Sequence, residues 1–179
     1  MSRTIGKIVI VLCCLIVASM WGYYFFFASE EGVYQIQDKK WRVAAQEICA
    51  AASAEREALA DTSGGNITDP TLEQMRQRAD IVDRATDIVE RMVTDIVAIE
   101  VDNADDRLRL DFFEENYRIL LSDRRRYTAS LRAGDDVQYN ETVVGGGPVT
   151  NVISDFTAGV KGNNVPECSP PGELGDVQP

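Results

Sequence analysis

The chain has 179 residues, no histidine, and 29 acidic residues against 18 basic ones. The lack of histidine excludes Ser-His-Asp triads, HExxH zinc sites and di-iron sites of the Glu-x-x-His type. All 29 acidic residues follow residue 29, where only 16 basic residues remain, so this part of the chain carries a net charge of −13. Such a surface repels nucleic-acid phosphates and anionic lipid headgroups, and we expect no nucleic-acid partner.

The first element in chain order is an uncharged run of 22 residues, Ile8–Ser29. As a helix it would be about 33 Å long, which matches the roughly 30 Å hydrocarbon core of a bilayer. Arg3 and Lys7 precede the run, and two glutamates follow it. Because positive residues stay on the cytoplasmic side, this pattern predicts a cytoplasmic N-terminus at residues 1–7 and a single transmembrane helix at residues 8–29. We therefore expect a plasma-membrane protein whose C-terminal domain is extracytoplasmic.

A cleaved signal peptide is the alternative interpretation of this run. The apolar part of a signal peptide spans about 7–15 residues and ends in small residues, whereas this run is longer and ends in large aromatic residues. These aromatic residues are typical of the belt at a membrane interface, and an uncleaved anchor is favoured. Cys13 and Cys14 lie within the run as small apolar residues, with acylation as the alternative.

Two helical patterns follow the anchor. In the first, from about residue 33 to residue 60, apolar side chains share one face at a spacing of 3.6 residues. A loop of Gly, Asn and Ser separates it from the second pattern, in which Asp69 is the predicted N-cap and Pro70 the first helical residue. The second helix should run to about Glu100, and its apolar arc covers half of its circumference, which indicates packing against more than one neighbour.

A third long helix and a short fourth one complete the predicted fold. The third follows the capping residues of the turn 101–106 and ends at Gly134. After a polar linker ending in three glycines, which reads as flexible, the fourth helix covers about residues 148–160. Matched long helices with short loops predict antiparallel neighbours. The fold class is therefore all-α: an up-down-up bundle at residues 33–171, followed by a loose tail at residues 172–179.

The bundle contains only two cysteines, Cys49 and Cys168. In the predicted topology both lie outside the cytoplasm, where disulfides persist. Counting helical rises places the end of the fourth helix at about the level of Cys49, so a crossing segment could bring Cys168 to it. The sequence therefore predicts a Cys49–Cys168 disulfide, with a pair of free thiols or an intermolecular bridge as alternatives.

The stretch WRVAAQEICAAASAEREAL, followed far downstream by VPECSPPGEL, resembles a loose group of actinobacterial extracytoplasmic helical proteins. They share an anchor or signal, an alanine-rich first helix with one cysteine, and a second cysteine in a proline-rich C-terminal segment. The resemblance covers Trp41 to Leu174 and implies a bacterial cell-envelope location without a defined activity.

Three charged residues fall on predicted apolar faces near the distal end of the bundle: Glu55, Arg78 and Arg124. Charges in such a position normally need partners, so an ion pair of Glu55 with either arginine is the structural interpretation. The functional interpretation is a site for a small anion or peptide. The basic run Arg124–Arg126 complements a helix C-terminus or forms a docking patch.

These observations predict a non-enzymatic protein without a cofactor or a metal, which acts by contact with another membrane or envelope protein. An accessory or scaffolding role in an envelope complex, for example a respiratory one, fits this description. The alternative is a binding module that takes a small anion or peptide at the distal cluster. Otherwise no small-molecule ligand is expected.

Overall fold

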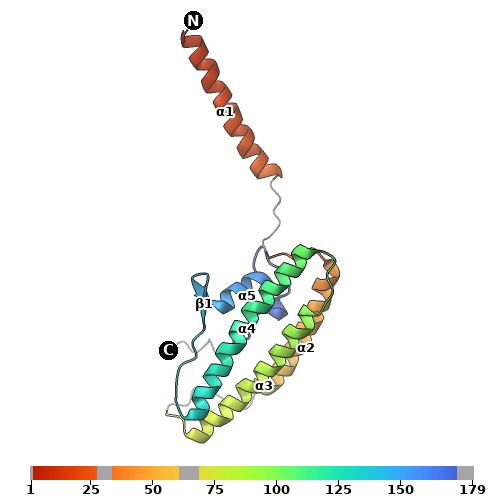
Figure 1. The fold of residues 1–179 in the computed structure, drawn as a ribbon, viewed down its shortest axis with the longest axis vertical. Helices are drawn as coiled ribbons and strands as arrows, with labels where there is room; N and C mark the ends of the chain where they lie inside the picture. Colours follow the sequence, from red (N-terminus) through yellow and green to blue (C-terminus); the bar gives the residue numbers. More distant parts are fainter. Residues whose placement is uncertain (1, 28–33, 61–68, 173–179) are drawn as a thin grey trace. The chain divides into compact units, whose positions relative to one another are not determined.

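The computed structural model describes residues 2–27, 34–60 and 69–172. The chain divides into two units, Met1–Glu31 and Gly32–Pro179. The first unit holds helix α1 (Ser2–Phe27). The second unit holds the remaining helices and a short β-hairpin, and it is the part in which residues from distant positions of the sequence pack together (Figure 1).

Helix α1 presents its apolar side chains to the outside. The described ones are 53–68% exposed, and they include Ile10, Val11, Leu12, Leu15, Ile16, Val17, Met20 and Trp21. Among the described residues, no helix combines the length and the apolar character that a membrane crossing requires. The span predicted at residues 8–29 continues past α1, and Ala28 and Ser29 lie outside the described residues.

The second unit is a helical bundle. Its long helices are α2 (Lys39–Ala60), α3 (Leu72–Val97) and α4 (Ala104–Ala133), and consecutive ones run antiparallel (Figure 1). Helix α3 packs against both α2 and α4, which confirms the two neighbours expected from its wide apolar arc. The short α5 (Val149–Thr157) covers α4, and the 3₁₀ turn η1 (Pro166–Cys168) covers α2. The predicted helical bundle with a short fourth helix is therefore confirmed.

The first bundle helix begins later than the sequence suggests. It starts at Lys39 and not near Val33, and the described residues before it, Tyr34–Asp38, form no regular element. The carboxylate of Asp38 accepts a hydrogen bond from the backbone N–H of Lys40 at 2.8 Å, as a residue at a helix start does. The segment Tyr34–Asp38 is called the strap from here on, because contacts with distant residues hold it.

The start of α3 also differs from the prediction. Thr71, and not Asp69, is the N-cap, and it forms a capping box with Gln74. The Thr71 hydroxyl accepts from the Gln74 N–H at 3.3 Å, and the Gln74 side chain accepts from the Thr71 N–H at 2.8 Å. Two backbone donors are satisfied in this way. Asp69 has a φ of 54°, in the left-handed region, whereas an N-cap residue adopts an extended conformation.

Helix α4 begins and ends as the sequence indicates. Asn103 is its N-cap and accepts from the N–H of Asp106 at 2.7 Å, and Gly134 ends it in the left-handed conformation. The linker beyond it was wrongly predicted to be flexible. Strands β1 (Val143–Val144) and β2 (Gly147–Pro148) form an antiparallel hairpin there. Gly145 and Gly146 have φ values of 63° and 92°, which a two-residue turn of type I′ requires at both positions.

The core is centred on aromatic side chains from three helices, α2, α4 and α5. Phe156 of α5 lies 4.9 Å from Phe113 of α4 and 6.4 Å from Trp41 of α2, measured between ring centres. Phe113 also packs edge-on against Tyr117. A second, smaller cluster lies between α3 and α4 and is composed of Met75, Ala79, Val82, Tyr127 and Leu131. The bundle thus has a large aromatic core and a narrower apolar contact between two helices.

Candidate functional site

Cys49 of α2 and Cys168 of η1 form a disulfide bond, with their Cα atoms 5.0 Å apart. Both cysteines are buried, and 119 residues separate them in the sequence. The predicted pairing is therefore confirmed. In the chain-entropy model, a bond that closes a loop of this size stabilises the folded state by about 4–5 kcal/mol.

The residues around Cys168 are held by hydrogen bonds as well as by the disulfide. The hydroxyl of Tyr117 donates to the carbonyl of Cys168 at 2.6 Å. The N–H of Val165 donates to the carbonyl of Thr157 at 2.9 Å, and the Val165 side chain is fully buried. The C-terminal segment is thus part of the fold as far as the described residues extend. Residues 173–179 of the predicted tail lie outside them.

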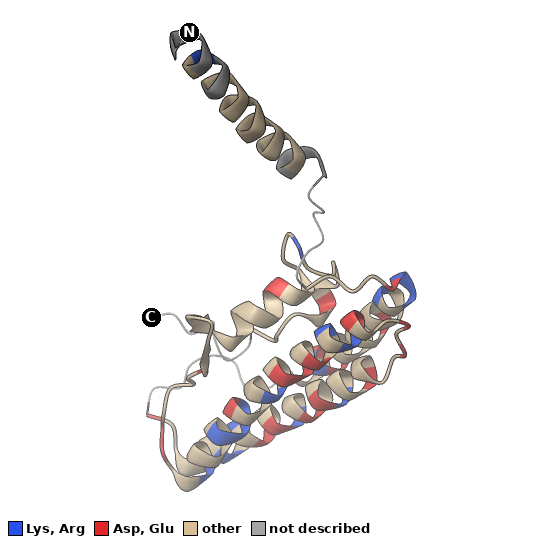
Figure 2. Ribbon diagram, turned by 45° about the horizontal axis from the view of Figure 1, so that its top comes forward, with Lys and Arg blue, Asp and Glu red and all other residues tan. Residues whose placement is uncertain are grey.

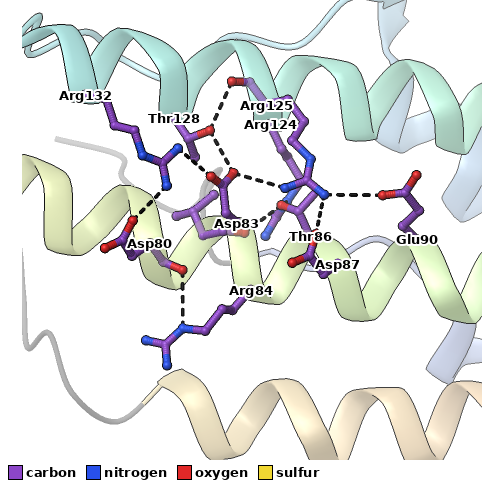
Figure 3. Close-up of polar contacts among 11 residues, drawn as sticks. Asp80, Asp83, Arg84, Thr86, Asp87, Glu90, Arg124, Arg125, Thr128 and Arg132 are labelled. Atoms are coloured by element: carbon purple, nitrogen blue, oxygen red, sulfur yellow. Dashed lines mark hydrogen bonds and ion pairs between the residues drawn. The ribbon is translucent and has the colours of Figure 1, made fainter.

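Arg124 lies inside the bundle, where its side chain is 2% exposed. Its Nε donates to the hydroxyl of Thr86 on α3 at 2.9 Å (Figure 3). Burial raises the pKa of the nearby Tyr117, and the positive charges of Arg56 and Arg124 partly oppose this effect. Arg124 therefore belongs to a polar group within the bundle, together with an arginine of α2.

The inward charge on α2 is Arg56, whereas the sequence pattern indicated Glu55. The buried residues of this helix are Trp41, Ala45, Cys49 and Ala52, and the half-buried Arg56 continues their stripe. Glu55 lies beside the stripe with its side chain 57% exposed, and it accepts a hydrogen bond from Arg91 of α3 at 2.8 Å. The predicted inward position of Glu55 was therefore wrong, because the helix buries Cys49 at its centre and turns Glu55 to the outside.

Arg78 of α3 contacts Tyr127 of α4. Its guanidinium lies 5.8 Å from the centre of the Tyr127 ring, a cation–π distance. Tyr127 in turn packs edge-on against Tyr139, with ring centres 5.6 Å apart. The described contacts of Glu55, Arg78 and Arg124 thus lead to three different partners. A ligand site shared by these residues stays a prediction, and the described contacts do not bring them together.

An ion-pair network joins α3 and α4 along their exposed edge (Figure 3). Arg132 of α4 donates to the carboxylates of Asp80, at 2.8 Å, and of Asp83. Asp83 also accepts from the hydroxyl of Thr128 at 2.8 Å and lies 3.3 Å from Arg125. Arginines of α4 thus face carboxylates of α3 along this edge.

The three arginines of the run 124–126 point in different directions, as adjacent helical residues do. Arg125 pairs with Asp87 and with Glu90, and the hydrogen bond that its guanidinium donates to Asp87 is the main reason why the pKa of Arg125 is raised. Arg126 pairs with Asp123 on its own helix at 2.6 Å. The run is therefore distributed over the interior, the α3 edge and the outer face of α4, and its members do not form one basic patch.

Two buried polar residues that hold the strap were not singled out from the sequence: Asp106 and Asn163, both 0% exposed. Asp106 lies in the turn 101–106, where Asn103 is the N-cap of α4. The capping residues of this turn gave no sign that a distant segment binds there. Burial by itself would raise the pKa of Asp106, but hydrogen bonds from the N–H groups of Gln37 and Asp38 and from Arg109 and Asn103 outweigh it and lower the pKa. The carboxylate is therefore kept ionised inside the fold.

The outer face of α4 carries an open groove of about 640 Å³ next to the hairpin. Its lining is mixed, with Glu114 and Arg118 paired to each other and Ile119 between polar neighbours. Within the part of the chain that the structure describes, no three His, Cys, Asp or Glu residues are placed so that they could hold a metal ion.

Comparisons with protein-family models, with curated proteins and with solved structures found no match to this chain.

Proposed function

We propose that this protein is a single-pass, membrane-anchored helical bundle that acts by contact with other proteins. Residues 8–29 would be the anchor, and the bundle would lie on the extracytoplasmic side of the plasma membrane. Its role would be that of an accessory or scaffolding component of a cell-envelope complex, of which a respiratory complex is one concrete form.

The exposed apolar surface of α1 is the observation that carries this proposal. Its described apolar side chains are more than half exposed, and the described core of the bundle contains none of them. Exposed apolar surface of this extent is unfavourable in water and is typical of segments that contact lipid or another protein. The uncharged sequence of the segment and the basic residues before it support a membrane anchor with its N-terminus inside.

The Cys49–Cys168 disulfide supports the extracytoplasmic location. Structural disulfides are rare in the cytoplasm of mesophilic cells, because thiol-reducing systems keep cysteines reduced there. Cys13 and Cys14, in contrast, lie in the proposed anchor and are free. The disulfide-bonded cysteines thus lie in the proposed extracytoplasmic bundle, and the free cysteines lie in the proposed anchor.

A contact role fits the surface of the bundle better than catalysis does. The carboxylates of the α3–α4 edge are paired with arginines, and the buried Asp106 is saturated with hydrogen-bond donors. Hydrogen bonds to the ionised form lower the pKa of Asp106, which makes this carboxylate a poor general base. What remains is a helical surface that carries charged residues of both signs (Figure 2), and such a surface is suited to binding a partner.

The proposal is tested by purifying the full chain from its native membranes in mild detergent. We expect a membrane or envelope protein to co-purify with the full chain at a fixed ratio. A variant that lacks residues 2–31 should leave the membrane, and the partner should not co-purify with it. A matched variant, Leu12→Asp/Ile16→Asp, keeps the length of the segment and should also leave the membrane. A full-length chain that purifies alone from the soluble fraction would contradict both the anchor and the contact role.

A further inference from the structure

Two buried polar residues, Asp106 and Asn163, hold the strap Tyr34–Asp38 on the bundle, and both lie far from it in the sequence. The carboxylate of Asp106 accepts from the N–H of Gln37 with both oxygens, each at 3.0 Å, and from the N–H of Asp38 at 3.1 Å. Asn103 and Arg109 donate to the same carboxylate at 2.9 and 2.8 Å. A fully buried carboxylate is therefore used to bind the backbone of a segment about 70 residues away.

Asn163 holds the strap from the C-terminal side. Its side-chain oxygen accepts from the N–H of Ile36 at 2.7 Å, and its amide donates to the carbonyl of Tyr34 at 2.8 Å. The same amide donates to the carbonyl of Phe156 at 3.1 Å. Asn163 thus pairs with the backbone of the strap on both sides of Gln35, much as a neighbouring β-strand would.

The turn after α5 is shaped to present Asn163. A Cβ atom at Gly162 would lie 2.5 Å from the carbonyl oxygen of Asp155 and 2.8 Å from that of Phe156, so only glycine fits there. The N–H of Asn163 then donates to the carbonyl of Phe156 at 2.9 Å. The strap side chains complete the contact, because Ile36 is fully buried and the Tyr34 ring stacks on Phe112 at 5.4 Å.

The disulfide determines which residues of the bundle can be extended by a force on the two chain ends. A bond between Cys49 and Cys168 closes a loop that a force between the two chain ends cannot extend. Asp106 and Asn163 both lie inside this loop, whereas the strap and the first part of α2, Lys39–Ile48, lie outside it. The hydrogen bonds of Asp106 and Asn163 therefore connect the extensible N-terminal part of the bundle to the part that the disulfide protects.

We propose that Asp106 and Asn163 form a clamp that resists a pull arriving along the chain from α1. The clamp transmits this pull to α4 and to the C-terminal segment, and so protects the start of α2. The proposal rests on the proposed function, because the pull acts between a membrane anchor at one end and a partner bound to the bundle at the other. With the clamp closed, a tethered bundle stays folded under load and keeps the strap fixed to it. A partner bound to the bundle is then held close to the membrane.

The test is a single-molecule force measurement on the full oxidised chain in detergent, with handles at its two ends. Opening of residues 34–48 should appear as the first extension. The freed segment is about 50 Å long when fully extended at ~3.4 Å per residue, and the extension equals this length minus the distance that the folded segment already spans. In Asn163→Ala and in Asp106→Asn, this opening should be roughly tenfold faster at a fixed force, because hydrogen bonds to buried groups are lost. The matched controls Asn151→Ala on α5 and Asp105→Asn beside Asp106 are both exposed and should open like the parent chain.

Equal opening rates in the parent chain, the clamp variants and the controls would overturn the clamp. Formation of the Cys49–Cys168 bond in each variant, measured by non-reducing peptide mapping, shows that the variant has folded. Hydrogen exchange at Ile36 and Gln37 supplies a second measurement, and it should accelerate in the clamp variants alone. The force measurement needs no membrane, so a clamp that fails here is distinguishable from an anchor that fails in the purification experiment.

Discussion

The two polar regions of the bundle stabilise it in different ways. At the strap, Asp106 and Asn163 are fully buried and bind backbone groups of distant segments. Along the α3–α4 edge, Arg125 and Arg132 bind the carboxylates of a neighbouring helix, with their own side chains 39% and 41% exposed. A buried hydrogen-bonded charge is costly to disrupt, whereas exposed ion pairs contribute about 0–1 kcal/mol each. The strap contacts should therefore contribute more to the stability of the bundle than the ion pairs of the α3–α4 edge do.

The largest expected effect comes from removing the disulfide that joins α2 to the C-terminal segment. In Cys49→Ala/Cys168→Ala, the free energy of unfolding should fall by about 4–5 kcal/mol, because the unfolded chain regains the entropy of a long loop. Urea denaturation in detergent measures it. The control Cys13→Ala/Cys14→Ala changes two free cysteines of α1 and should leave the transition of the bundle in place. A loss below 1 kcal/mol in the first variant would show that the bond adds little.

The next largest effect is expected at Asp106. Asp106→Ala leaves the N–H groups of Gln37 and Asp38 and the guanidinium of Arg109 without their shared acceptor, and we expect a loss of about 3–4 kcal/mol. Asp105→Ala, in the same turn of α4 but exposed, should cost less than 1 kcal/mol. Comparable losses in the two variants would remove the distinction between the strap and the exposed surface.

The stability of the strap should depend on pH in one direction. The pKa of Asp106 is lowered in the folded state from its ordinary value of 3.8, so its contribution is complete above pH 3.8 and is lost as the pH falls through the folded pKa. The parent chain should therefore lose more stability than Asp106→Asn between pH 4 and pH 2. Parallel losses in denaturation curves over this range would assign the acid sensitivity to other carboxylates.

The smallest effect is expected along the α3–α4 edge. Arg132→Ala removes the pairs with Asp80 and Asp83 and should cost about 1 kcal/mol or less, with the loss shrinking further in high salt. Arg76 is an exposed arginine near the start of α3, and Arg76→Ala provides a control with the same change in net charge. A loss of 3 kcal/mol that salt does not reduce would place the edge in the same class as the strap.

What the sequence predicts well here is what local patterns encode. The apolar spacing of α3 and the cap residues of α4 specify helices, and the cysteine count allows one intramolecular pair, Cys49–Cys168. The face of α2 was harder, because its alanine-rich pattern allows rotations that exchange Glu55 for Arg56. The clamp could not be predicted at all, since the link from Asp106 and Asn163 to the strap spans about 70 and about 130 residues.

The most direct measurement is the state of the cysteines in the native membrane. Cells are treated with a thiol-blocking reagent, the membranes are washed at alkaline pH, and the chain is mapped without reduction. An anchored, extracytoplasmic bundle predicts that the chain stays in the washed membranes and that the peptides containing Cys49 and Cys168 remain linked. A chain released by the wash, or one with blocked thiols at both positions, would contradict it.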